Sequence, residues 1–438
     1  MQYRKDLKSG NELSVLGLGC MRFPRGLGGR IDKEKTEQII REAIEGGINY
    51  FDTAYVYPGS EVITGEILHK LRLRDKVYIA SKLPHVACKK PEDFDRLFSE
   101  QLKRLKTDHI DYYLVHNIGE INSWERLRQL GIEQWVANKK AQGQIGQFGF
   151  SFHGARDGFM ELLESYGWDF CQIQYNYGDE NYQAGRAGLE RAYEKGIPVI
   201  VMEPLLGGKL ATGLPKKAVQ LFEKANKARS NTEGKAHAQA GKAQGKEATP
   251  ADRVHSNEGL PADKTSQKEA TPAAWGLRWV WDQPEVTLLL SGMSSLEQLR
   301  ENLDTAATAK PGMLSKNEHA TIAQVIEIFR AADKVPCTGC HYCMPCAQGV
   351  NIPGCFASYN ARHVNGLVAG MSSYVMSTAA LRSGGGNNSG PSNCTQCGVC
   401  EKACPQHIEI SRELTAVKKK MEPFWYKPVV ALVRKFMS

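Results

Sequence analysis

Eight short apolar runs alternate with segments of helical periodicity, and this alternation limits the fold more than any other feature of the chain. Strands that are apolar along their whole length are buried on both faces, and helices between them make such strands pair in parallel. Eight units of this kind close into a (β/α)8 barrel of about 250 residues. The chain has 438 residues, so a further domain is expected. The expected strands are 13–20, 48–54, 76–82, 109–116, 145–151, 170–177, 197–204 and 286–292.

Three of these strands end at or near a polar residue: Asp52, Lys82 and His116. In a barrel of parallel strands the carboxyl ends meet on one face, so residues that are far apart in sequence come together there. Tyr57 follows Asp52 closely in the string FDTAYVY. The four side chains are therefore predicted to share one site.

The chemistry of these four side chains is specific. Tyr57 could supply a proton, although a tyrosine with the ordinary pKa of about 10 is a weak acid at neutral pH. A nearby Lys82 ammonium is predicted to lower that pKa, with Asp52 paired to the lysine. His116 could hold a carbonyl oxygen by a hydrogen bond. Such a set would protonate a carbonyl oxygen as hydride reaches its carbon. The alternative for each residue alone is structural: a helix cap, a packed ring, a solvated lysine or a core histidine.

The string DTAYVY has the spacing DTAxxY of the aldo-keto reductases, and the lysine and histidine follow in the order of that family. The chain therefore resembles an aldo-keto reductase. The resemblance implies that Asp52, Tyr57, Lys82 and His116 form a catalytic tetrad on a (β/α)8 barrel that binds NAD(P)H. It also implies an oxidoreductase that reduces an aldehyde or ketone, or oxidises the alcohol. The identity of the substrate is not encoded in such a motif.

The same resemblance implies which residues contact the nucleotide. Two positions depart from the family pattern. Phe152 and His153 follow the strand-end serine where many members have Asn, and Gln298 stands where many NADPH-specific members have Arg. The choice between NADP and NAD therefore stays open. The implied cofactor-binding residues are Gly19, Met21, Ser151, Gln172, Gly292, Ser294, Gln298, Glu301 and Asn302.

Cysteine is concentrated near the C-terminus in two runs, CTGCHYCMPC and CTQCGVCEKACP. Compact cysteine runs in an intracellular chain indicate metal binding rather than disulfides. The second run has the CxxCxxCxxxCP spacing of bacterial ferredoxins. The first run departs from it, because its last gap is shorter and Pro345 precedes the final cysteine. The alternative interpretation is two zinc sites with four cysteines each.

Together the two runs resemble a dicluster 4Fe-4S ferredoxin with an enlarged spacer. In that fold the fourth cysteine of each run binds the other cluster. The resemblance therefore implies two 4Fe-4S clusters and a crossed ligand pattern. One cluster would be held by Cys337, Cys340, Cys343 and Cys404, and the other by Cys394, Cys397, Cys400 and Cys346.

The composition also suggests how the chain is divided. Residues 228–271 are rich in Ala, Lys, Gly, Gln and Ser and poor in large apolar residues, so a disordered insertion is predicted there. The predicted organisation is a barrel over 1–310 that contains this insertion, a linking helix over 311–330, an iron-sulfur domain over 331–415 and a tail over 416–438.

Several classes of function are not favoured. The N-terminus is polar and no apolar run reaches the roughly 20 residues that cross a bilayer, so a cytoplasmic protein with no transmembrane segment is expected. The net charge is +8, but no basic patch with interleaved aromatics favours nucleic acid. The expected partners are a small carbonyl compound and a ferredoxin or other redox protein. No flavin motif is visible. The alternative function is a redox-sensing or electron-transfer interaction protein that binds nucleotide with little carbonyl turnover.

Overall fold

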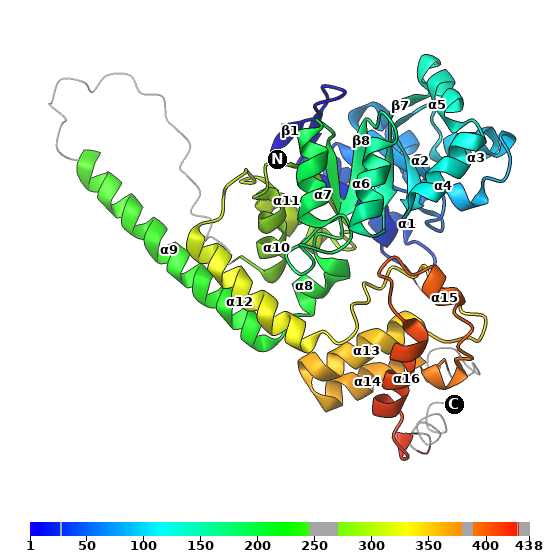
Figure 1. Cartoon of the computed structure of the whole chain (residues 1–438). Helices are drawn as coiled ribbons and strands as arrows, with labels where there is room; N and C mark the ends of the chain where they lie inside the picture. Colours follow the sequence, from blue (N-terminus) through cyan, green and yellow to red (C-terminus); the bar gives the residue numbers. More distant parts are fainter. Residues whose placement is uncertain (27–28, 245–269, 379–388, 427, 429–438) are drawn as a thin grey trace, which may run out of the picture.

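The computed structural model describes residues 1–26, 29–244, 270–378, 389–426 and 428 (Figure 1). Its centre is a closed barrel of parallel strands in the order β10-β3-β4-β5-β6-β7-β8-β9. The predicted (β/α)8 barrel is therefore confirmed. The strands are β3 Leu16–Gly19, β4 Tyr50–Asp52, β5 Tyr78–Leu83, β6 Ile110–Ile118, β7 Ile145–Phe152, β8 Phe170–Gln174, β9 Val199–Met202 and β10 Val286–Ser291.

The end of the barrel at the strand N-termini is closed by an antiparallel hairpin of β1 (Tyr3–Lys5) and β2 (Glu12–Ser14). The hydroxyl of Tyr112 donates to Asp6 in the hairpin turn at 2.7 Å. The rings of Tyr112 and Phe170 pack edge to face inside the barrel. Because side chains fill this end, only the opposite end of the barrel can receive a ligand.

Helices surround the barrel on its outer side (Figure 1). They form because apolar residues recur at helical spacing and face the strands, as Ile39, Ile40 and Ala43 do in α1. Asp32 caps α1 by accepting from the backbone N–H of Lys35. The surrounding helices are α1 Lys33–Glu45, α2 Ser60–Leu71, α3 Glu92–Leu105, α4 Ile121–Gln129, α5 Ile132–Ala141, α6 Arg156–Glu164, α7 Gly185–Glu194, α10 Pro272–Trp281 and α11 Leu296–Ala306.

The first part of the predicted disordered insertion, residues 228–244, is helical. Helix α9 spans Lys216–Gln244 and runs beside α12, Lys316–Ala332 (Figure 1). The prediction of disorder from residue 228 was based on the scarcity of large apolar residues, which limits a core but does not prevent a helix. Ala, Lys and Gln all have high helix propensity. Residues 245–269 lie outside the described part of the chain.

The C-terminal unit has a hydrophobic core of its own, which includes Val335, Phe356, Tyr374 and Val417. The predicted boundary at residue 416 falls inside helix α16, and Met421 and Tyr426 are also buried in this core. The first part of the predicted tail therefore belongs to this unit. Its helices are α13 Ile352–Asn365, α14 Leu367–Thr378, α15 Val399–Lys402 and α16 Ile410–Met421.

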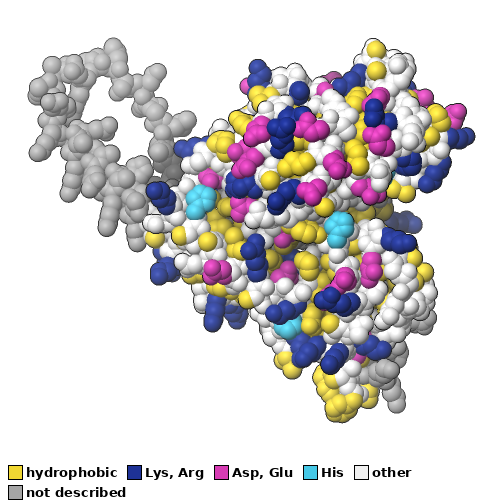
Figure 2. Space-filling model, in the orientation of Figure 1, with side chains coloured by type: hydrophobic (Ala, Val, Ile, Leu, Met, Phe, Trp, Pro, Cys, Tyr) yellow, Lys and Arg dark blue, Asp and Glu magenta, His cyan; other side chains and the backbone are white. Residues whose placement is uncertain are grey.

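Acidic and basic side chains are interspersed over the barrel in Figure 2. The C-terminal unit exposes large apolar side chains, among them Val368 and Phe424. Among the described residues, no helix combines the length and the apolar character that a bilayer span needs.

Candidate functional site

The barrel brings the four candidate side chains of the sequence together. Asp52 is the last residue of β4, Lys82 lies next to the end of β5, and His116 lies in the last part of β6. Tyr57 lies in the turn between β4 and α2. Neighbouring strands pair in parallel here, so the strand ends form one edge of the barrel. The predicted convergence of these residues is what the fold shows.

Asp52 and Lys82 form a buried ion pair. The Lys82 Nζ donates to Asp52 Oδ1 at 2.6 Å, to Asp52 Oδ2 at 2.7 Å and to the Thr53 carbonyl at 2.8 Å. Burial raises the pKa of Asp52, and the attraction of Lys82 opposes that rise. Three acceptors satisfy the ammonium, so the pair is held rigidly at this position. The Lys82 Nζ lies 5.1 Å from the centre of the Tyr57 ring.

The pKa of Tyr57 does not move in the direction predicted from the sequence. Burial raises it well above the ordinary value, and the neighbouring Tyr342 and Asp52 raise it further. The predicted lowering of the Tyr57 pKa by Lys82 was wrong because burial, the largest cause, raises that pKa, and Asp52 beside the lysine raises it as well. Tyr57 is therefore protonated across the neutral range.

His116 lies edge to face against Tyr57, with ring centres 5.8 Å apart. Burial lowers the pKa of His116 well below its ordinary value, and Lys82 and His153 lower it further. The imidazole is therefore neutral at physiological pH. Its Nε2 lies 2.9 Å from the hydroxyl oxygen of Tyr342. Tyr342 also lies beside Tyr57 and raises its pKa.

Tyr342 was missed by the sequence reasoning, although it lies inside the first cysteine run. It belongs to the C-terminal unit, which covers the open end of the barrel. The Arg22 guanidinium donates to the Thr338 carbonyl at 3.1 Å, and the Gln183 amide donates to the Pro405 carbonyl at 2.8 Å. An aromatic residue between cluster cysteines was the available signal, but only the docking of the two units places it in the site.

A cavity of about 380 Å³ opens from this site toward β10 and α11. Two carboxyl or amide oxygens in it are buried without a hydrogen-bond partner, Gln172 Oε1 and Glu203 Oε2. The cavity is lined by Asp52, Tyr57 and most of the residues expected to contact the nucleotide, which are Gly19, Met21, Gln172, Gly292, Ser294, Gln298, Glu301 and Asn302.

Some of the expected nucleotide contacts are already engaged within the protein. Ser151 does not line the cavity, and its hydroxyl accepts from the Asn117 backbone N–H at 2.8 Å. Gln298 Oε1 accepts from the Ser294 backbone N–H at 2.9 Å. At the start of α11, Ser295 caps the helix through the N–H of Gln298. A helix N-terminus beside a deep cavity favours an anionic ligand such as a phosphate.

Glu203 was also missed by the sequence reasoning. It follows β9, lines the cavity and is partly buried, with its Oε2 atom shielded from solvent. Burial raises its pKa to about 7, against the opposing attraction of Arg22. Thr338 of the C-terminal unit donates to its other oxygen, Oε1, at 3.4 Å.

Glu203→Gln is expected to stabilise the protein increasingly as pH rises. When folding raises the pKa of a carboxyl, ionisation of that carboxyl lowers the free energy of unfolding of the protein. For Glu203 this loss develops from about pH 4.5 to above about pH 7 and amounts to at most about 3 kcal/mol. Glutamine is neutral throughout and lacks this cost. Melting temperatures of the two proteins at about pH 5.5 and about pH 8.5 give the test. A difference of equal size at both pH values would contradict the raised pKa.

The fourth cysteine of the second run lies with the first three cysteines of the first run. Cys337, Cys340, Cys343 and Cys404 line one small cavity. The pKa of Cys343 is raised by burial and then by the other three thiols of this group.

The second group of cysteines shows the same crossing. The pKa of Cys400 is raised by burial, by Glu401, and by Cys394 and Cys346. Cys397 is exposed, whereas Cys355 is buried in the core of the C-terminal unit. Within the described residues, no three Cys, His, Asp or Glu side chains converge closely enough to hold a single metal ion. The first group lines a small cavity.

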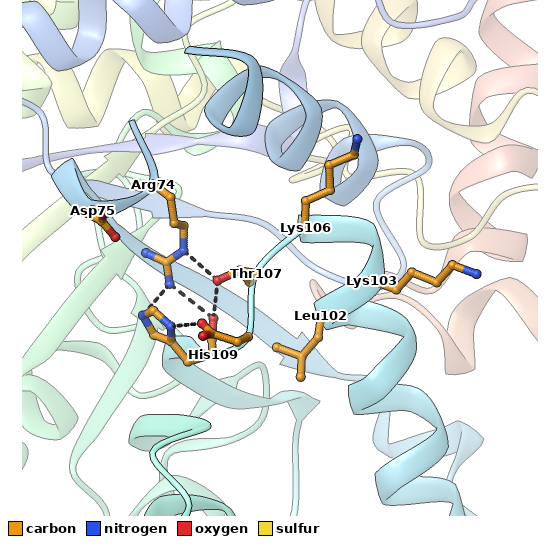
Figure 3. Close-up of a pocket in the computed structure, with 8 residues that line it drawn as sticks. Arg74, Asp75, Leu102, Lys103, Lys106, Thr107 and His109 are labelled. Atoms are coloured by element: carbon orange, nitrogen blue, oxygen red, sulfur yellow. Dashed lines mark hydrogen bonds and ion pairs between the residues drawn. The ribbon is translucent and has the colours of Figure 1, made fainter. Parts of the chain in front are cut away.

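A second hollow lies at the opposite, N-terminal end of β5 and β6 (Figure 3). Its side chains satisfy one another: Arg74 donates to Thr107 at 2.9 Å and to the His109 carbonyl at 3.2 Å. Arg74 also pairs with Asp111 at 2.8 Å. Because these polar groups are paired internally, we assign this hollow a structural role.

Known proteins resemble both parts of the chain. A model of the aldo/keto reductase family matches residues 15–327, and a model of a 4Fe-4S dicluster domain matches residues 336–409. An NADH-specific methylglyoxal reductase of Escherichia coli is 27% identical over 317 residues, which cover 66% of this chain and 89% of that protein. An uncharacterised oxidoreductase of Bacillus subtilis, YrpG, is 28% identical over 229 residues, covering 48% and 68%.

The fold has solved counterparts as well. An aldo-keto reductase of Bacillus halodurans, solved in its holo form, aligns with a TM-score of 0.51 and 23% identity over 74% of this chain and 96% of its own. The 4Fe-4S match replaces the zinc interpretation of the cysteine runs.

Proposed function

The chain belongs to the aldo/keto reductase family and carries a 4Fe-4S dicluster domain after its barrel; from this premise we propose that it is an NAD(P)H-dependent reductase of an aldehyde or ketone. The reverse oxidation of the alcohol uses the same site. The observation that carries the proposal is the position of Tyr57 and His116 above the buried Asp52–Lys82 pair, at the end of a deep cavity.

Each of these four residues has a role in the proposed reaction. Tyr57 donates its phenolic proton to the carbonyl oxygen, and neutral His116 orients that oxygen by a hydrogen bond. Lys82, fixed by Asp52, stabilises the phenolate that Tyr57 becomes. A bound reduced nicotinamide supplies the hydride to the carbonyl carbon. Hydride and proton together give the alcohol, and Tyr57 recovers its proton from solvent.

The cavity residues fit a nucleotide. The unpartnered Gln172 Oε1 can accept from a carboxamide N–H. The N-terminus of α11, with Gly292 and Ser294 before it, fits phosphate. Gln298, Glu301 and Asn302 border the adenosine end, and Gly19 and Met21 border the nicotinamide end. We propose NADP or NAD as the cofactor. Position 298 carries a neutral Gln, and not the Arg that would favour NADP.

The crossed cysteine groups support two 4Fe-4S clusters, held as the sequence predicted. Each cluster, when bound, passes one electron. Cys397 is exposed, whereas Cys340 lines the same cavity as Tyr57. The two groups therefore lie between the surface and the active site. We propose that a ferredoxin or another redox protein exchanges electrons near Cys397.

Anaerobic mixing of the purified holoprotein with NADPH, then NADH, then methylglyoxal tests this function, with the visible absorption recorded throughout. Methylglyoxal is chosen because a relative is named for its reduction. We expect nucleotide oxidation that depends on the aldehyde. Bleaching of the iron-sulfur absorption by nucleotide alone would show that hydride-derived electrons reach the clusters. An unchanged iron-sulfur absorption during aldehyde reduction would show that hydride transfer to the aldehyde is separate from electron transfer through the clusters.

One observation favours the alternative function of a redox sensor: the hydroxyl of Tyr342 already contacts both Tyr57 and His116. The same experiment distinguishes the two functions. Tight nucleotide binding, without oxidation by methylglyoxal or by any other aldehyde of a panel, would favour the sensor.

A further inference from the structure

The C-terminal unit contributes a side chain to the centre of the barrel site. Tyr342, between Cys340 and Cys343, is partly buried there. Its hydroxyl oxygen lies 2.9 Å from His116 Nε2, and its side chain lies beside that of Tyr57, whose pKa it raises. The ring centres of Tyr342 and His116 are 6.0 Å apart.

These two contacts are the contacts that the proposed reaction requires of the substrate. A carbonyl oxygen must accept from the Tyr57 hydroxyl and from His116, each at about 3 Å. Two oxygens cannot occupy the one position that is within reach of both groups. We propose that Tyr342 is a built-in occupant of the carbonyl-oxygen position, and that a carbonyl substrate binds only after its side chain withdraws. The inference rests on the proposed function.

The backbone that carries Tyr342 is held firmly against the barrel. Arg22 donates to the Thr338 carbonyl at 3.1 Å. The same carbonyl lies so close to Gly207 that a Cβ added there would be 2.1 Å from it. Because the backbone is fixed in this way, the withdrawal of Tyr342 is a rotation of its side chain and not a departure of the unit.

The unit is anchored on its other side as well. The Tyr182 hydroxyl donates to the Gln406 carbonyl at 2.6 Å, and the Gln406 amide donates to Gln174 at 2.8 Å. Gln174 is the last residue of β8. Tyr342 therefore competes with substrate as an intramolecular ligand whose position is set by the docking of the iron-sulfur unit.

Tyr342→Phe tests the proposal, because it removes the competing oxygen and keeps the ring. The probe is acetate, a carboxylate that accepts from the same two donors, titrated by calorimetry into the anaerobic holoprotein saturated with NADP+ or NAD+. We expect the acetate Kd to fall by roughly three- to tenfold, the range for loss of one competing hydrogen bond. The KM for an aldehyde should fall in the same direction.

The matched control is Tyr359→Phe, which removes a phenolic oxygen from the same unit away from the cavity. Its acetate Kd should equal that of the wild type. An unchanged or raised acetate Kd in Tyr342→Phe would overturn the proposal, since Tyr342 would then assist ligand binding or only pack.

A second measurement uses the wild-type protein and does not depend on any variant. Acetate added to the nucleotide complex should displace the Tyr342 side chain, and the rate at which N-acetylimidazole acetylates the Tyr342 hydroxyl, followed by peptide mass spectrometry, should then increase. No increase at saturating acetate would overturn the proposal. Because neither measurement requires turnover, failure here is distinguishable from absence of carbonyl reduction, which the assay with methylglyoxal detects.

Discussion

Tyr57→Phe is expected to lower kcat for aldehyde reduction by roughly a hundred- to ten-thousand-fold, the range for loss of a general acid. The phenolic proton is the one that the carbonyl oxygen receives, and phenylalanine has none to give. The ring itself should keep its edge contact with His116 and its place above Lys82. Nucleotide binding should therefore persist. Steady-state rates with saturating nucleotide and a separate nucleotide titration measure the two effects.

Tyr55→Phe is the matched control for this experiment. Tyr55 lies in the same turn, but its hydroxyl donates to Glu100 at 2.9 Å, on the outer side of the barrel. Its kcat should remain near that of the wild type. Full activity in Tyr57→Phe would reject the assigned acid. If that activity disappeared in the Tyr57→Phe, Tyr342→Phe double variant, the acid would be Tyr342.

Replacement of Cys394 and Cys397 by serine should abolish electron exchange with a reduced viologen while aldehyde reduction by NADPH continues. A serine hydroxyl does not replace a thiolate as an iron ligand in a site of this kind. Cys397 is exposed, Cys394 is partly buried, and neither lines the cavity that contains Tyr57. Anaerobic viologen oxidation and nucleotide-linked turnover, assayed on the same preparation, measure the two routes.

Cys355→Ala is the control for this second variant, because Cys355 is buried in the core of the same unit and belongs to neither cysteine group. Both activities should survive in it. Persistence of viologen oxidation in the double cysteine variant would reject the relay. Loss of both activities would indicate that the cluster near the surface is needed to hold the unit on the barrel.

Much of the fold could be predicted because its signals are local. Each barrel strand is a short apolar run between helical segments, and the strands order themselves by chain sequence in the closed sheet. The strand-end positions of Asp52, Lys82 and His116 follow directly from that pattern. The part of α9 from residue 228 onward was predicted to be disordered, because its low apolar content argues against a packed segment while its high helix propensity favours a helix.

The electrostatics of the site could not be predicted from residue types alone. Lys82 beside Tyr57 suggested a lowered tyrosine pKa, but burial raises it. Glu203 carried no motif, yet the same burial raises its pKa to about 7. Desolvation depends on every atom that surrounds a group, and a sequence gives only the neighbours along the chain.

The sequence by itself determined the barrel, the three polar residues at its strand ends with Tyr57 close after the first, and the two cysteine runs, because periodicity and short spacings are properties of neighbouring residues. The tertiary structure alone decided what meets at the site. His116 and Tyr342 are 226 residues apart along the chain, and they meet at 2.9 Å only because the iron-sulfur unit docks on the open end of the barrel. That docking depends on shape and on hydrogen bonds such as Arg22 to Thr338, between surfaces that exist only after both units have folded.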